Sequence, residues 1–303
     1  MMICFALLGV LFSGLEVVAQ PFAHSYKNYL LFFSTGHLVL TEKGYQLLIL
    51  IWTGSYIVII AFISVLYVYR WLSLCDDPRK RKFDGSGTIL WLLYPFLPAV
   101  VYSAVLYTFC RADKYSDRNL KGLLLTNYGY NNITVLPRFI VEPFTADGFA
   151  NKSNLFVLAL AVILIGFHYF IMLFCGLKMH FNFKEELKKF SVPQRRLQRQ
   201  FFKALIVQSL GPTIFLVLPA GPVLLTPIFA TLFGLELSWP SGWLFSLIGL
   251  YPPFDSIAFM LIVKEYKKLI KNKFLCCIPG IQTSKSAAKK NRLELPEVSA
   301  APC

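Results

Sequence analysis

The chain alternates between long uncharged runs and short basic loops. Four runs lack Asp, Glu, Lys and Arg: residues 44–69, 88–110, 153–177 and 204–235. Each is longer than the roughly 20 residues that a helix needs to cross a bilayer. Two further apolar stretches each hold a single acid, Glu16 in residues 1–19 and Asp255 in residues 237–263. The pattern predicts an all-α, polytopic transmembrane helix bundle with six spans.

The run over residues 204–235 also contains prolines at positions 212, 219, 222 and 227. A straight helix of this length would measure about 48 Å, against a hydrocarbon core of roughly 30 Å. Each proline removes a backbone donor, and in lipid the freed carbonyl needs a neighbouring helix or water as a partner. We therefore expect this helix to bend and to pack inside the bundle.

The composition agrees with a lipid environment. The chain is 56% hydrophobic and 15% charged, whereas a soluble domain carries about 25% charged residues. We expect one transmembrane domain over residues 1–274. The polar, small and basic tail over residues 275–303 is expected to be cytoplasmic and disordered.

The distribution of Lys and Arg predicts the orientation in the membrane. Of 30 such residues, 22 lie in residues 70–82, 178–203 and 264–303, and the alternate loops hold the other 8. Because basic residues in short loops stay on the cytoplasmic side, the C-terminus is predicted to be cytoplasmic. Clustering at the membrane exits also argues against nucleic acid as a partner, although the net charge is +14.

The glycosylation sequons test this orientation independently. Two N-x-[S/T] sites occur, at Asn132 and Asn151, and both lie in the long loop that the charge count places outside. We therefore expect a glycoprotein with glycans at these two asparagines.

The N-terminal stretch over residues 1–19 has two readings. It is a membrane span that begins at the first methionine, or it is a signal peptide cleaved after the small residues ending at Ala19. The absence of a basic n-region and the presence of Glu16 speak against a signal peptide. Composition alone leaves both open.

Several stretches resemble the Str class of nematode seven-transmembrane chemoreceptors, the class that includes the olfactory receptor for diacetyl. They are LEVVAQPFAHSY at 15–26, VYRW at 68–71, LQRQFFKAL at 197–205 and YPPFDSIAFMLIVKEYKKLI at 251–270. The resemblance implies a chemosensory, olfactory G-protein-coupled receptor that binds a small-molecule odorant or a peptide. It also implies a heterotrimeric G protein as partner and a multi-pass protein of the plasma or ciliary membrane. The six spans would correspond to helices two to seven, so a truncated form is expected.

The same resemblance suggests roles for the basic residues at the cytoplasmic face. Arg70 ends a span within Tyr69-Arg70-Trp71, which looks like the arginine motif that couples such receptors to G proteins. Arg195, Arg196 and Arg199 belong to a basic loop that suits an acidic partner. The plainer alternatives are a snorkelling anchor for Arg70 and simple retention of positive charge for the loop.

Proline and acid positions in the last two spans suggest a switch. Asp255 lies within a span, where a carboxylate normally faces the bundle interior. Pro252 precedes it in an element that, by resemblance, takes the place of the switch in the seventh helix. Pro212 and Pro219 resemble the hinge of the sixth helix. A structural polar cluster and ordinary proline kinks are the alternatives.

The seven cysteines do not suggest a disulfide framework, because four of them fall on the predicted cytoplasmic side. Cys276 and Cys277 follow a short amphiphilic run, a placement compatible with palmitoylation; two unmodified cysteines are the alternative.

No motif for catalysis, metal or cofactor binding occurs. The four histidines are scattered, and glycine-rich phosphate loops and H-E-x-x-H are absent from the sequence. We expect a protein that is not an enzyme and that has no cofactor, no metal and no identifiable ligand-binding residues. A transporter or channel subunit, or a non-signalling receptor fragment, remains as the alternative function.

Overall fold

The computed structural model of the chain describes residues 2–36, 40–75, 78–133, 136–145, 148–186 and 191–262. The helices of the bundle are α1 (Met2–Ala19), α2 (Glu42–Leu74), α3 (Ser86–Leu93), α4 (Phe96–Phe109), α6 (Lys152–Glu186), α7 (Val192–Pro212), η4 (Thr213–Val217), α8 (Leu218–Leu232), α9 (Trp243–Gly249) and α10 (Tyr251–Ile262). The segment η1 (Pro78–Phe83) joins α2 to α3, and α5 (Lys114–Tyr128) lies outside the bundle.

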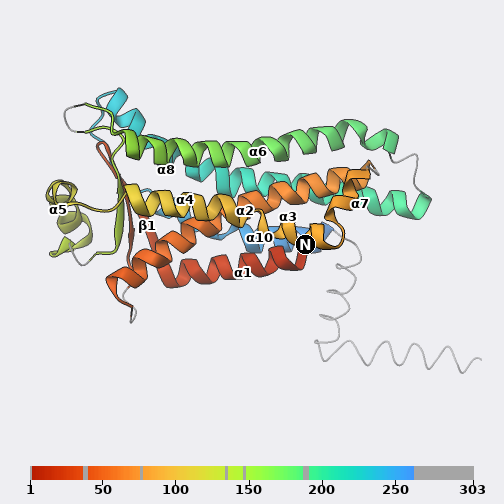
Figure 1. The fold of residues 1–303 in the computed structure, drawn as a ribbon, viewed down its shortest axis with the longest axis horizontal. Helices are drawn as coiled ribbons and strands as arrows, with labels where there is room; N and C mark the ends of the chain where they lie inside the picture. Colours follow the sequence, from red (N-terminus) through yellow and green to blue (C-terminus); the bar gives the residue numbers. More distant parts are fainter. Residues whose placement is uncertain are drawn as a thin grey trace, which may run out of the picture.

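The described helices pack side by side as an antiparallel bundle (Figure 1). By element order they make up six rods. Three rods consist of more than one element: α3 with α4, α7 with η4 and α8, and α9 with α10. The central rod is α2, which packs against α1, α4 and α6. Isoleucine and aromatic side chains are buried almost all round its middle, as expected for a helix enclosed by other helices.

Hydropathy and length confirm four membrane-spanning candidates in the described part of the chain: Glu42–Leu74, Ser86–Phe109, Lys152–Asn182 and Leu210–Leu232. Residues Cys4–Ala19 form a shorter apolar helix. It packs in the bundle against α2, α9 and α10. The four long runs therefore form helices that are long and apolar enough to cross a membrane, as predicted, while the count of six spans stays a prediction.

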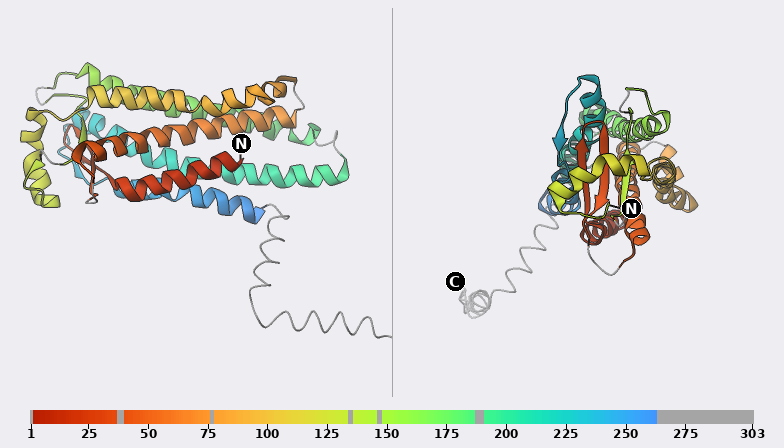
Figure 2. Two further views of the ribbon diagram at one scale, coloured as in Figure 1. Left: turned by 60° about the horizontal axis from the view of Figure 1, so that its bottom comes forward. Right: turned by 90° about the vertical axis from the view of Figure 1, so that its left-hand side faces the viewer.

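A four-stranded antiparallel sheet closes one end of the bundle, and the purely helical prediction missed it. Its strands are β1 (Pro21–Tyr26), β2 (Tyr29–Ser34), β3 (Arg138–Val141) and β4 (Ser238–Trp239), in the order β3-β2-β1-β4. Three separate loops supply them. The end-on view shows the strands across this end of the bundle, with α5 on their outer side (Figure 2). We call this end the sheet end.

The sheet is buried on both faces, which explains the apolar sequence of β2. Tyr29, Leu31 and Phe33 belong to a cluster with the leucines of α5, whereas Leu30 and Phe32 belong to the main core of the bundle. This alternation is the two-residue period of a strand. The sheet therefore lies as a layer between the bundle and α5.

Candidate functional site

A small cavity lies in the bundle core next to the sheet. Its volume is about 60 Å³. All its lining residues are uncharged; they come from β2 (Phe32), α2 (Trp52, Thr53, Tyr56, Ile57), α4 (Tyr102), α6 (Ala161, Ile165), α8 (Ala220, Val223, Leu224) and α9 (Phe245, Ile248). Since a water molecule needs about 10–15 Å³ on this measure, the space suits roughly four to six non-hydrogen atoms.

Aromatic rings separate this central cavity from the sheet. Phe32 of β2 stacks on Phe245 of α9, with 6.1 Å between the ring centroids and 5° between the planes. Trp52 packs between Phe245 at 4.8 Å and Phe12 of α1 at 5.8 Å. The sheet thus supplies part of the cavity wall through Phe32.

One lining residue connects the cavity to the segment in which the hinge was predicted. The hydroxyl of Tyr56 donates to the backbone carbonyl of Leu216 at 2.9 Å. Leu216 is buried at the centre of η4. Tyr56 is therefore a direct contact between the cavity and this segment.

The η4 segment is a π-helical turn set between two of the predicted hinge residues. Pro212 ends α7, Thr213–Val217 is π-helical, and Pro219 lies in the first turn of α8. The tyrosine hydroxyl of Tyr169 in α6 hydrogen-bonds the hydroxyl of Thr213 at 2.9 Å. Wide turns of this kind are common at functional bends, because they replace the regular hydrogen-bond ladder.

Two positions that the sequence singled out separately lie close together away from the sheet end. Arg70 of α2 interacts electrostatically with Asp255 and Tyr251 of α10, and with Tyr67 on its own helix. Asp255 is buried, with 6% of its surface exposed. We call these four residues the arginine cluster. It bridges the second and last rods of the bundle.

Glycines allow the helices around the arginine cluster to approach closely. A Cβ atom at Gly211 of α7 would lie 3.0 Å from the ring of Tyr251, and one at Gly9 of α1 would lie 2.8 Å from Cβ of Pro252. Pro252 therefore packs against α1. These contacts place α10 tightly against both of its neighbours.

A wider cavity of about 300 Å³ opens near the arginine cluster, between α2, α6 and α7. Tyr67 lines it, together with Gly176, His180 and Leu210. The basic residues predicted for coupling belong to the start of α7: Arg195 is half-buried and Arg199 is exposed. Arg196 lies on the same helix, but its side chain is outside the described set.

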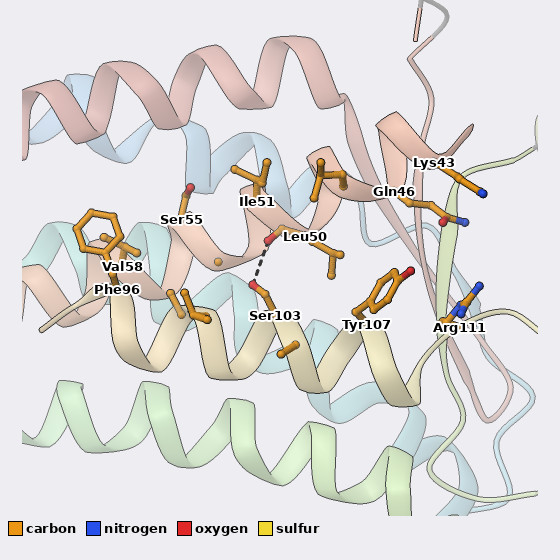
Figure 3. Close-up of a pocket in the computed structure, with 15 residues that line it drawn as sticks. Lys43, Gln46, Leu50, Ile51, Ser55, Val58, Phe96, Ser103, Tyr107 and Arg111 are labelled. Atoms are coloured by element: carbon orange, nitrogen blue, oxygen red, sulfur yellow. Dashed lines mark hydrogen bonds between the residues drawn. The ribbon is translucent and has the colours of Figure 1, made fainter. Parts of the chain in front are cut away.

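A third hollow is a lateral groove of about 740 Å³ between α2 and α4 (Figure 3). Lys43 and Arg111 lie at its sheet end. Gly54 brings the two helices together, since a Cβ atom there would lie 2.8 Å from the hydroxyl of Ser103. That hydroxyl donates to the carbonyl of Leu50 at 3.2 Å. The groove is therefore larger than the central cavity and has two cations at one end.

The two sequons both lie at the sheet end and differ in their surroundings. Asn132 is exposed. Asn151 is half-buried, and its side-chain oxygen accepts the backbone N–H of Asn154 at 3.3 Å at the start of α6. Cys276 and Cys277 lie outside the described residues.

Polar contacts tie the sheet to its surroundings. His24 of β1 is buried and hydrogen-bonds Tyr128 of α5 at 2.6 Å and Ser238 of β4 at 3.1 Å. Burial lowers the pKa of His24 from its ordinary value. Arg138 of β3 pairs with Asp117 of α5 at 2.5 Å and also donates to the carbonyls of Ile133 and Leu136. The sheet is therefore held by side chains from three different loops.

Sequence reasoning missed the central cavity entirely. Its lining consists of ordinary apolar and aromatic residues, and only their meeting in space distinguishes them from the rest of the core. Within the described residues, no group of three or more His, Cys, Asp or Glu is placed to hold a metal ion.

Comparison with known proteins gives a consistent family. Residues 1–271 match the family described as serpentine type 7TM GPCR chemoreceptor Str. G-protein coupled receptor str-33 of Caenorhabditis elegans is 32% identical over 288 residues, which cover 93% of this chain and 82% of the relative. Serpentine receptor class r-10 of the same organism is 22% identical over 300 residues, 98% of this chain and 87% of the relative. No solved structure matches.

Proposed function

The chain belongs to the Str family of serpentine seven-transmembrane chemoreceptors, and from this premise we propose that the central cavity binds its ligand and that the arginine cluster controls its G protein. The chain is a chemosensory G-protein-coupled receptor of the membrane. This membership does not favour the transporter or channel alternative. The observation that carries the proposal is the hydrogen bond from Tyr56, which lines the cavity, to the carbonyl of Leu216 in the π-helical turn.

The proposed mechanism is a population shift between a closed and an open bundle. A ligand in the cavity favours the open form only if it binds that form more tightly. Tyr56 is the contact through which the difference reaches η4. A bend at Pro212 and Pro219 then moves α7 relative to α10, and Gly211 carries the movement to Tyr251.

That movement would change the contacts of Arg70. In the closed form its guanidinium interacts with Asp255 and Tyr251. Separation of α7 from α10 would release the guanidinium toward the cavity between α2, α6 and α7, where a G protein can offer carbonyl and carboxylate acceptors. Arg195, Arg196 and Arg199 would add attraction for an acidic face of the same partner.

We also propose that all six rods cross the membrane, with the sheet end outside and the C-terminus in the cytoplasm. The basic residues of η1 and of the start of α7 support this orientation, because these two segments lie at the opposite end of the bundle from the sheet and the sequons. Glycosylation at Asn132, a plasma or ciliary location and palmitoylation at Cys276 and Cys277 belong to the same proposal.

The test reconstitutes the receptor in lipid nanodiscs with a heterotrimeric G protein and measures ligand-stimulated nucleotide exchange across a panel of small volatile molecules. Val223→Phe, which fills the central cavity, should abolish both binding and stimulation. Arg70→Ala should retain ligand binding and lose stimulation. Val101→Phe on the exposed face of α4 serves as the matched control, because Val101 lines none of the three hollows. Full stimulation of the Val223→Phe receptor would place the ligand elsewhere.

A further inference from the structure

Lys43 and Arg111 mark the same boundary of the membrane. Lys43 directly precedes the uncharged run over residues 44–69, and Arg111 directly follows the run over residues 88–110. Both lie at the sheet end of the lateral groove between α2 and α4 (Figure 3). With α2 and α4 across the membrane, as proposed above, cations at these positions lie at the depth of the lipid head groups.

No acid competes for the two cations at the groove. Asp and Glu are absent from its described lining, and the ion pairs found among the described residues do not include Lys43 or Arg111. The guanidinium of Arg111 lies over the ring of Tyr107, 5.3 Å from its centroid, and Tyr107 also lines the groove. A guanidinium held on a ring in this way keeps its in-plane N–H groups available for an anion.

The rest of the groove is largely apolar and open to the surface of the bundle. Its deeper part contains Leu50, Val58 and Ala99, which are buried. Exposed surface inside a membrane is covered by acyl chains, so the shallower part of the groove faces lipid. Five apolar lining residues are 43–65% exposed: Leu47, Ile51, Phe96, Val100 and Tyr107.

The length of the groove suits an acyl chain anchored at one membrane boundary. The lining extends from Lys43 to Val58 along α2 and from Phe96 to Arg111 along α4. At ~1.5 Å per residue each stretch measures roughly 22 Å. Half of the hydrocarbon core of a bilayer is about 15 Å thick, so a chain lies along the groove while its head group reaches the two cations.

We propose that the lateral groove binds one phospholipid of the bilayer, with an acyl chain along α2 and α4 and its phosphate between Lys43 and Arg111. The proposal rests on the membrane crossing of these helices, which belongs to the proposed function, and does not involve the central cavity. A phosphodiester directs its oxygens to several sides and contacts cations from two helices, whereas the planar carboxylate of a fatty acid engages mainly one. The groove therefore favours a phospholipid over a fatty acid or a diacylglycerol.

The test uses the full chain in phosphatidylcholine nanodiscs that contain a trace of a lipid with a photoactivatable diazirine in one acyl chain. Three tracers share this chain: phosphatidylcholine, diacylglycerol and the free fatty acid. After irradiation, peptide mapping measures the labelling of the groove residues of α2 and α4. This value is divided by the labelling of the exposed face of α6 around Ile163 and Phe170, which cancels the concentration of each tracer in the bilayer.

On this relative scale we expect the phosphatidylcholine tracer to label the groove about tenfold more than the other two tracers, or about 1.4 kcal/mol, which two exposed ion pairs supply together. Lys43→Gln combined with Arg111→Gln should remove this preference. The control combines Lys114→Gln with Lys121→Gln, which removes the same charge from the exposed face of α5 and should keep the preference. A preference that survives in the first double variant, or that is absent from the wild-type chain, would overturn the proposal.

Two neighbouring valines of α4 test the position of the acyl chain. Val100 lines the groove and Val101 does not, and both side chains are exposed. Val100→Trp should reduce groove labelling by the phosphatidylcholine tracer by about fivefold or more, because the indole occupies the space of the chain. Val101→Trp should leave the labelling near the wild-type value. Equal labelling in the two variants would contradict a chain in the groove.

Labelling of α6 separates this proposal from the membrane crossing on which it rests. If no tracer labels α6 or the groove, both the crossing and the lipid site are wrong. If α6 is labelled and the groove shows no preference for the phosphate-bearing tracer, the crossing stands and the lipid site is wrong. The measurement needs neither receptor ligand nor G protein, so its result is independent of the role proposed for the central cavity.

Discussion

Tyr56→Phe removes the link between the ligand cavity and the π-helical turn while keeping the aromatic ring. The hydroxyl of Tyr56 is the donor to the carbonyl of Leu216 at 2.9 Å, and both residues are buried. In the closed bundle this bond holds α2 against η4. If opening breaks the bond, deleting the hydroxyl destabilises the closed form alone.

The size of the expected free-energy change follows from the burial of this hydrogen bond. A buried hydrogen bond contributes about 1 kcal/mol net, and leaving its acceptor unsatisfied costs about 1–3 kcal/mol. A shift of roughly 1–2 kcal/mol corresponds to a factor of about 5–30 in the ratio of the two forms. We therefore expect basal nucleotide exchange without ligand to rise by about 5–30-fold in Tyr56→Phe.

The assay measures basal exchange by purified G protein at equal amounts of folded receptor in nanodiscs. The matched control is Tyr102→Phe, which deletes another hydroxyl from the lining of the same cavity. Basal exchange of Tyr56→Phe within twofold of the wild-type value would refute the reasoning. An equal rise in Tyr102→Phe would show that any lost hydroxyl loosens the bundle.

Three further predictions concern the sheet end. Burial lowers the pKa of His24 from 6.5. The contribution of His24 to stability is therefore present above pH 6.5 and is lost as the pH falls through the lowered pKa. When the pH is decreased below 6.5, the melting temperature of the wild-type chain should drop more than that of His24→Gln. Arg138→Met should destabilise the chain by about 3 kcal/mol, because it leaves Asp117 beside an apolar layer and two carbonyls without their donor. Thermal or chemical unfolding measures this change, and an unchanged unfolding midpoint would contradict the prediction. In microsomes Asn132→Gln should remove more glycan than Asn151→Gln, since Asn132 is exposed whereas Asn151 caps α6; glycans on neither residue would argue against the proposed orientation.

The sequence by itself determined the solvent of this protein, its long helices and its family. A bilayer requires continuous apolar runs, because unpaired backbone groups are too costly in lipid. Such runs are local in sequence, so residues 44–69 and 153–177 predicted α2 and α6 to within a few residues at the sheet end. They fell short at the other end, where both helices continue past the last uncharged residue. The family followed from short motifs such as VYRW, which also need no tertiary information.

Other features of the helices could be recognised only in the tertiary structure. The uncharged run over residues 88–110 reads as one span, but it is divided into α3 and α4 at Tyr94 and Pro95. The run over residues 237–263 begins with a strand. Its first residues pair with β1, and no local pattern encodes a partner more than 200 positions away.

The tertiary structure alone decided which residues form the sites. Tyr56 and Leu216 are 160 positions apart, and both have the apolar neighbours of any buried helix. Arg70 and Asp255 were each noticed as charges near or within the membrane, but their proximity depends on how α2 and α10 pack. Periodicity reports which face of a helix is buried. Which neighbour covers that face, and how much volume is left between the side chains, is decided only when the helices meet.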